Sequence, residues 1–300
     1  MTIAVINAVG TTPVEAGATP LAAQLAVLPP GAPVLILLHG YRYSPSRDHA
    51  DPHRNILSAT SARRAPSWPR RMGFGRGQPG LCIAFGWEAG GTLWRAYAEA
   101  GRAGVALAAL IGHIRALHDG PVSIMAHSLG ARVALAALPL LAAGAVARMV
   151  LLAGAEFRAC AQVALATPAG RSAEVLNVTS RENDIYDFLF ERLLAPLSRS
   201  PALGAGLDLP CCLTLQIDAA DHRAGLRRLG FRTADAARRV CHWSAYLRPG
   251  LFPLYRTFLL APGTLPLPLL RGILPGHQAP RWSRLLALPL PLPRPRNAVQ

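Results

Sequence analysis

One serine of this chain lies in a setting that could make it a nucleophile. The uncharged run 122–126 is followed by His-Ser-Leu-Gly at 127–130, and an Ala-, Leu- and Val-rich helical pattern starts at once. This arrangement predicts a strand, a sharp turn and a helix, with the hydroxyl of Ser128 exposed at the bend. The small residues Ala126 and Gly130 would let the strand and the helix pass close to the turn.

The junction resembles the nucleophile elbow of the α/β-hydrolases, Gly-x-Ser-x-Gly, with Ala126 in place of the first glycine. A serine hydroxyl is a weak nucleophile, so it needs a base within hydrogen-bond reach and an acid that orients this base. The resemblance implies that the acid and then the histidine follow the serine along the chain, each on a loop after a strand.

The candidate acids follow the expected strand 174–180. Asp184 is our choice, because it lies where the loop after a late strand would present a carboxylate. Glu182 and Asp187 are close enough in the sequence to be alternatives. Asp184 could instead cap a helix that begins near residue 185, which is a common role for aspartate.

Three histidines follow these carboxylates, at positions 222, 242 and 277. We favour His242 as the base, because its aromatic and apolar neighbours would bury and fix an imidazole. His222 comes just after a strand end and stays the alternative, although charged residues flank it. His277 lies in a proline-rich tail and is the weakest candidate.

An acyl-transfer reaction also needs two N–H donors for the oxyanion. One is the backbone amide of Leu129, directly after the nucleophile. We assign the second to the amide of Tyr41, because the apolar strand 34–38 ends in His39-Gly40 and a glycine there lets the loop turn back towards Ser128.

Taken together, these residues are similar to the serine-hydrolase branch of the α/β-hydrolases over about residues 34–258. The resemblance implies hydrolysis of a carboxylic ester, thioester or lipid ester through an acyl-enzyme, with no organic cofactor and no metal. The substrate would be a small-molecule or lipid ester. Two alternatives stay open, a catalytically inactive scaffold used as a binding module and an acyltransferase.

The elements around these residues predict the fold class. Six apolar runs, at 34–38, 81–87, 122–126, 147–154, 174–180 and 213–218, alternate with helical segments such as 91–118. Continuous apolar runs are typical of strands buried on both faces, so we expect an α/β protein with a mostly parallel central sheet and helices on both faces. Residues 3–9 would be an edge strand, 10–33 a loop with one short helix, and 55–63 another short helix.

We expect residues 1–260 to form a single α/β-hydrolase domain. Residues 261–300 carry frequent prolines and several arginines, so regular structure is improbable over most of this segment. By composition it is a partly disordered extension, and it is also the candidate for a peripheral contact with a membrane.

Composition narrows the partners further. The formal charge is +15, but all 31 basic residues are scattered arginines without an aromatic-interleaved basic motif, so we expect no nucleic-acid partner. The five cysteines lack a metal-like spacing and favour free thiols in a reducing compartment. Since the amino-terminal run has no basic residues before it and no segment is typical of a membrane span, we expect a cytoplasmic protein. The oligomeric state stays open.

Overall fold

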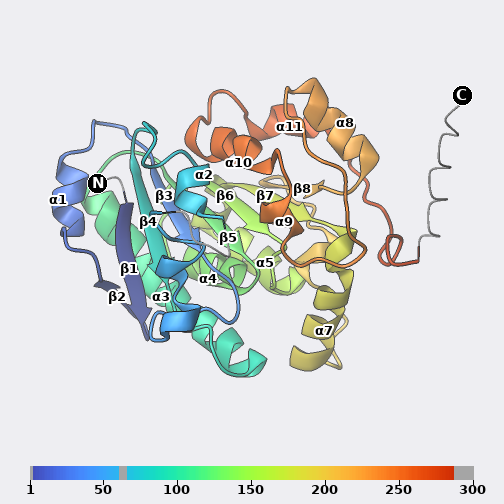
Figure 1. The fold of residues 1–300 in the computed structure, drawn as a ribbon, viewed down its shortest axis with the longest axis horizontal. Helices are drawn as coiled ribbons and strands as arrows, with labels where there is room; N and C mark the ends of the chain where they lie inside the picture. Colours follow the sequence, from blue (N-terminus) through green and yellow to red (C-terminus); the bar gives the residue numbers. More distant parts are fainter. Residues whose placement is uncertain (1–2, 61–65, 287–300) are drawn as a thin grey trace, which may run out of the picture.

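A computed structural model describes residues 3–60 and 66–286 of the 300-residue chain. Within these residues the chain forms one eight-stranded sheet in the order β2-β1-β4-β3-β5-β6-β7-β8 (Figure 1). Only the edge pair β1 and β2 is antiparallel; the other neighbouring strands are parallel. The strands are β1 Ile3–Val9, β2 Thr12–Glu15, β3 Val34–Leu38, β4 Leu81–Gly86, β5 Val122–His127, β6 Arg148–Leu152, β7 Glu174–Thr179 and β8 Cys212–Gln216.

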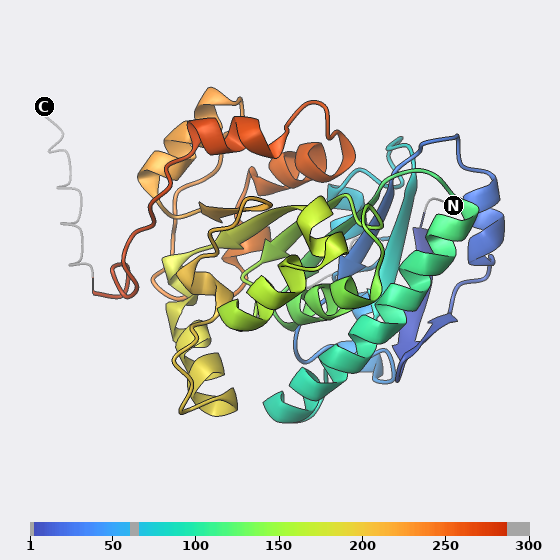
Figure 2. The same cartoon turned by 180° about the vertical axis from the view of Figure 1, so that it is seen from behind.

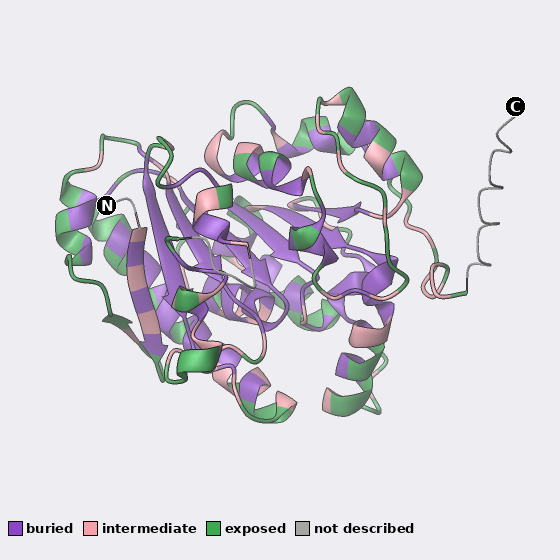
Figure 3. Ribbon diagram, in the orientation of Figure 1, coloured by how far each residue is buried: buried purple, intermediate pink, exposed green. Residues whose placement is uncertain are grey.

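The central strands are buried on both faces, as the apolar runs predict. Every residue of β3 is 0% exposed, with Leu35 and Leu37 in one core cluster and Val34, Ile36 and Leu38 in the other. Because successive side chains of a strand point to opposite faces, an uninterrupted apolar run serves two cores at once. Figure 3 shows the resulting buried band through the middle of the molecule.

The helices cover both faces of the sheet (Figures 1 and 2). The cluster that contains Val34, Ile36 and Leu38, the first core, packs α1, α3, α4 and α5 on one face. The cluster that contains Leu35 and Leu37, the second core, packs α2, α9, α10 and α11 on the other. The helices are α1 Leu21–Ala26, α2 Trp68–Arg71, α3 Leu93–Leu117, α4 Leu129–Ala137, α5 Arg158–Leu165, α6 Pro168–Ser172, α7 Asp184–Leu194, α8 Ala220–Arg228, α9 Ser244–Leu247, α10 Leu251–Leu260 and α11 Leu267–Ile273. This mostly parallel sheet with helices on both faces confirms the predicted fold class.

The long helix α3 is, by length and composition alone, apolar enough to cross a membrane, and half of its apolar window is buried inside the protein. It packs closely on α4: a Cβ at Gly104 would lie 2.6 Å from the Cβ of Ala136. The small residues of α3 therefore serve the packing of the protein, because they let α3 and α4 approach closely.

The amino-terminal third differs from the sequence prediction in two places. Residues 12–15, expected in a loop, form β2 and pair with the end of β1. The short helix expected at 55–63 is absent from its described part; a 3₁₀ turn at Pro52–Arg54 and the helix α2 stand on either side. Residues 61–65 of that prediction lie outside the described residues.

The carboxy-terminal segment is more regular than its composition indicates. Helix α11 buries Leu267 and Leu270, and the buried guanidinium of Arg148 donates to the carbonyls of Phe258 and Leu265, at 2.6 and 2.9 Å. Outside α11, the described residues 261–286 form neither helix nor strand, so the expectation of little regular structure over most of this segment is not contradicted; the composition gave no indication of α11 itself. Two of the segment's prolines, Pro266 and Pro268, stand at the start of α11, where a missing N–H removes no helical hydrogen bond. Residues 287–300 lie outside the described residues.

Candidate active site

Ser128 stands at the sharp turn between β5 and α4. Its backbone has φ 54° and ψ −125°, a strained conformation for a residue with a side chain. Its N–H donates to the Leu152 carbonyl at 3.0 Å, and its own carbonyl accepts from the Ala155 amide at 2.9 Å. Neighbouring strand ends therefore hold the strained turn in place.

Gly130, two residues after the serine, has to be small for a steric reason. A Cβ at Gly130 would lie 2.6 Å from the His39 carbonyl oxygen and 2.8 Å from that of Leu38. Helix α4 passes this close to the end of β3, so only glycine fits at that position.

Ser128 is only 4% exposed, whereas the elbow predicts an exposed hydroxyl. The loop after β3 covers it: a Cβ at Gly40 would lie 2.8 Å from the Ser128 Cβ. The turn thus lifts the serine out of the sheet, but the covering loop keeps the side chain from open solvent.

His242 lies directly at this hydroxyl. Its Nε2 is 3.0 Å from Ser128 Oγ, and its Nδ1 is 2.7 Å from Asn183 Oδ1. An amide oxygen only accepts, so the Nδ1 proton is on the side of Asn183 and the lone pair of Nε2 faces the serine. This is the tautomer that a general base requires. The alternative, His222, lies on α8, where its ring bonds the His277 carbonyl at 3.0 Å.

The expected acid does not reach the base. Asp184 accepts from the Arg181 guanidinium at 3.1 Å and from the Trp282 amide at 2.6 Å, while the neighbouring Asn183 contacts His242. The prediction of Asp184 as orienting acid therefore does not match this geometry. The physical reason is the rotation of the chain. Residues 181–183 form a 3₁₀ turn that leads into α7, and successive residues of a helix point about 100° apart, so Asn183 and Asp184 cannot face the same ring.

The two alternative acids have other contacts. Glu182 holds the loop of the base: its carbonyl accepts from the Cys241 amide at 2.8 Å, and its carboxylate pairs with the buried Arg248 at 2.5 Å. Asp187 accepts from Asn183 Nδ2 at 2.9 Å, so it stands behind the residue that contacts His242.

A second histidine supports the base. Burial lowers the pKa of His127 to about 4, so its ring is neutral at pH 7, and its Nε2 lies 3.2 Å from the His242 carbonyl. The Tyr186 ring stacks on the imidazole of His242, with ring centroids 4.8 Å apart. Burial also lowers the pKa of His242 well below its ordinary value, with a smaller contribution from His127. His242 is therefore unprotonated at neutral pH, which is the state that a general base requires.

The two expected oxyanion donors belong to the two segments that meet at the serine, the start of α4 and the loop after β3. Leu129 is the first residue of α4, where an amide has no intrahelical acceptor. Tyr41 directly follows Gly40, whose close approach to Ser128 brings this loop over the elbow. Neither amide N–H donates a hydrogen bond to another group in the described part of the chain.

Two residues whose role the sequence did not reveal fix this loop. His39 Nε2 accepts from the Trp87 amide at 3.0 Å, so its Nδ1 carries the proton and donates to the Gly40 carbonyl at 3.0 Å. The Trp87 indole stacks on the imidazole and donates to the His39 carbonyl at 3.1 Å. Burial lowers the pKa of His39 to about 3, so the ring stays neutral and structural. His39 and Trp87 follow the apolar strands β3 and β4, and the sequence of these strands does not indicate that the two side chains contact each other.

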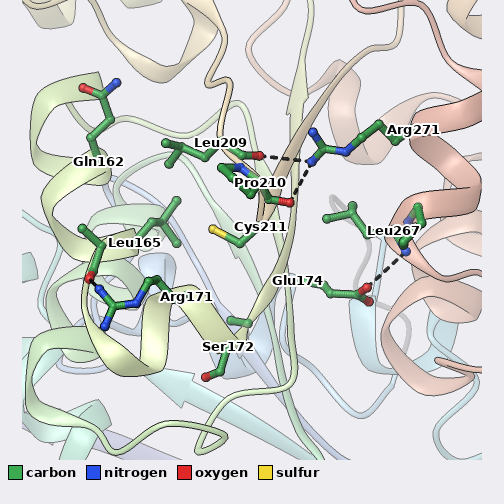
Figure 4. A pocket seen from close by; sticks show the side chains of 13 residues that line it. Gln162, Leu165, Arg171, Ser172, Glu174, Leu209, Pro210, Cys211, Leu267 and Arg271 are labelled. Atoms are coloured by element: carbon green, nitrogen blue, oxygen red, sulfur yellow. Dashed lines mark hydrogen bonds between the residues drawn. The ribbon is translucent and has the colours of Figure 1, made fainter.

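A cavity of about 500 Å³ lies where β7 and β8 begin, at the opposite strand ends from Ser128 (Figure 4). Glu174 and Cys211 at the amino ends of β7 and β8 line it, whereas Ser128 follows the carboxyl end of β5. Several polar groups along its wall have partners within the chain: Arg271 donates to the Pro210 carbonyl at 2.9 Å, and the Glu174 carboxylate accepts from the Leu267 amide at 3.2 Å. Among residues 3–60 and 66–286, no cluster of three His, Cys, Asp or Glu side chains could hold a metal ion.

The sheet and the site together define the fold. A mostly parallel eight-stranded sheet carries a serine on the strained turn after a central strand, and its base follows the last strand. These features are those of the α/β-hydrolase fold, and the chain has that fold.

Comparisons with known proteins add little beyond this. No protein-family model matches the chain, and no curated protein does. Among solved structures it is similar to the lipase BlEst2 of Bacillus licheniformis in its mature form, with 13% identity and a TM-score of 0.38 over 65% of this chain and 86% of that one. It is also similar to MenH from S. aureus, with 10% identity and a TM-score of 0.31 over 64% of this chain and 86% of that one. A third similar structure is the metagenomic carboxyl esterase MGS0156, with 16% identity and a TM-score of 0.30 over 66% of this chain and 67% of that one. These likenesses are distant, so the assignment of the fold rests on the strand order and the elbow.

Proposed function

We propose that this protein is a serine hydrolase that cleaves a carboxylic ester through an acyl-enzyme. The observation that carries the proposal is the continuous hydrogen-bonded series from Ser128 through His242 to Asn183, at 3.0 and 2.7 Å. In this geometry the base is oriented by an amide, as in the Cys-His-Asn sites of some proteases. Asn183 thus takes the place that the sequence assigned to a carboxylate.

The reaction follows from these positions. Ser128 Oγ attacks the ester carbonyl carbon while its proton passes to His242 Nε2. The Leu129 and Tyr41 amides bind the oxygen that becomes negative. Collapse of the tetrahedral intermediate breaks the bond to the alcohol, which takes the proton from His242 and leaves. Water, deprotonated by the same histidine, then releases the acid and restores Ser128.

Labelling with a fluorophosphonate probe tests the proposal, because the probe reacts only with an activated serine. We expect the wild-type protein to be labelled at Ser128 and to hydrolyse members of a p-nitrophenyl ester panel. Ser128→Ala should abolish labelling and lower the turnover at least about 10³-fold. Unlabelled wild-type protein, or full activity of Ser128→Ala, would refute the proposal.

A specific observation favours a second candidate, a non-catalytic α/β-hydrolase scaffold that binds a partner. The third position of the site is an amide and the serine is only 4% exposed. The same labelling decides between the two candidates, because a scaffold without an activated serine leaves the probe unreacted.

A further inference from the structure

Asp187 is a buried carboxylate behind the catalytic series. It lies one helical turn after Asn183 and is 4% exposed; its Oδ1 accepts from Asn183 Nδ2 at 2.9 Å. Within the described residues, its Oδ2 is buried without a hydrogen-bond partner. Gly204 packs so closely that a Cβ there would lie 1.8 Å from this oxygen. A carboxylate in such a place costs stability, so its presence calls for a functional reason.

The charges around Asp187 come from three elements. Arg281 of the carboxy-terminal segment and Arg181 of the 3₁₀ turn favour its ionised form, whereas Asp184 and Glu191 on its own helix oppose it. Burial is the largest influence and raises the pKa of Asp187 to about 7. The side chain therefore changes its charge near neutral pH.

An amide by itself can face a histidine in two ways, because it presents an acceptor on one side and donors on the other. If the Asn183 amide were reversed, its NH₂ group would face His242 and the ring proton would move to Nε2. Ser128 Oγ would then meet a donor instead of a base. An ionised carboxylate excludes this state, since it only accepts and so holds the NH₂ group of Asn183 on its own side.

We propose that Asp187 is the positioning residue of the site: its carboxylate, acting through Asn183, fixes the tautomer of His242 and supplies the negative charge that the third position lacks. This inference rests on the proposed serine-hydrolase function. The charge matters because His242 becomes positive when it takes the serine proton, and an anion near a buried cation stabilises it.

The pH dependence of the rate follows with a definite sign. As the pH falls through about 7, Asp187 gains a proton, its O–H can donate to Asn183 Oδ1, and the reversed amide becomes accessible. The rate should drop to a lower plateau there. Activity should end only at a lower pH, where His242 itself becomes protonated, because burial lowers the pKa of that ring.

The test compares three variants in fluorophosphonate labelling and in kcat and KM, at pH 5–9. Asp187→Asn removes the charge and the acceptor-only constraint, so we expect kcat to fall about 10- to 100-fold with little change in KM. The step near pH 7 should disappear from its profile. The matched control is Asp208→Asn, which removes one charge from an exposed aspartate and should keep both the rate and the profile.

The reciprocal variant Asn183→Asp/Asp187→Asn separates positioning from folding. It exchanges the two groups, so a carboxylate accepts from His242 Nδ1 and an amide donates to that carboxylate. We expect kcat to recover to within a few-fold of wild type. Failure of this recovery, or an Asp187→Asn protein with the wild-type rate and pH profile, would overturn the inference.

Nitrogen NMR of the His242 ring gives a readout that needs no substrate. The wild-type protein at pH 8 should carry the proton on Nδ1, and Asp187→Asn should show a mixture of the two tautomers. An unchanged tautomer in the variant argues against positioning. If wild-type protein is not labelled by the probe, the hydrolase proposal fails; if it is labelled at the same rate as Asp187→Asn, only the role of Asp187 fails.

Discussion

Replacing Gly40 by alanine tests the geometry of the oxyanion loop most directly. The added Cβ would lie 2.8 Å from the Ser128 Cβ and 3.0 Å from both the Nδ1 and the carbonyl oxygen of His127. None of these atoms is the far end of a flexible side chain. To lengthen the 2.8 Å contact to the 3.4 Å of ordinary packing, the loop or the elbow must move by about 0.6 Å.

This displacement acts on two groups that the proposed reaction needs. Either Ser128 moves away from His242, or the Tyr41 amide moves away from the oxyanion. A misplacement of about 1 Å, or the loss of one oxyanion donor, costs on the order of 10²-fold in rate. We therefore expect kcat to fall about 100-fold, with a loss of about 1–3 kcal/mol in the free energy of unfolding from overpacking.

The assay is hydrolysis of a p-nitrophenyl ester, with urea unfolding to measure stability. Gly112→Ala is the matched control, because Gly112 is an exposed residue within α3 and a Cβ there meets no atom within 4 Å. It should leave kcat unchanged and stabilise the protein by about 0.5–1 kcal/mol. A folded Gly40→Ala protein with wild-type kcat would show that this loop does not control the reacting serine.

Three further predictions follow from the contacts behind the site. Asp184→Asn should keep most of kcat per folded molecule, whereas Asn183→Ala should lower it at least about 10²-fold, because only Asn183 contacts the base; ester hydrolysis by the two variants compares them. Arg281→Ala should destabilise the fold by about 1–2 kcal/mol in urea unfolding, since Arg281 bonds both carboxylate oxygens of the buried Glu191 at 3.0 and 3.1 Å. The raised pKa of Asp187 means that the folded protein holds this proton more tightly than the unfolded chain does, so the carboxyl costs stability as the pH rises from about 4 to about 7. The melting temperature of wild type relative to Asp187→Asn should fall over that interval, and a constant difference would contradict the raised pKa.

Much of the fold could be predicted because its signals are local. The apolar runs at 34–38 and 81–87 become β3 and β4, since a strand buried on both faces is typically apolar without interruption. The turn at Ser128 was visible for the same reason: small residues, serine and helix formers stand next to one another in the chain. The strand β2 was missed because residues 12–15 are mostly exposed and owe their conformation to pairing with β1.

The carboxy-terminal segment shows a different limit. Its prolines indicated irregular chain, but Leu267 and Leu270 are buried in the second core, and the Arg148 side chain binds carbonyls on both sides of residue 260. Composition cannot reveal such contacts, because the partner is more than 100 residues away in the sequence. Burial against a distant surface outweighs a weak local preference.

The amino-acid sequence by itself determined the sheet, the nucleophilic turn and the order in which a base must follow it. Only the tertiary structure decided that an amide, Asn183, contacts His242 and that the Asp187 carboxylate stands behind that amide. Asn183, Asp184 and Asp187 lie within five residues, and each carries a side-chain oxygen that could accept from an imidazole N–H, so their order in the sequence does not show which one contacts the histidine. The rotation of the chain through the 3₁₀ turn into α7 selects which of them faces His242.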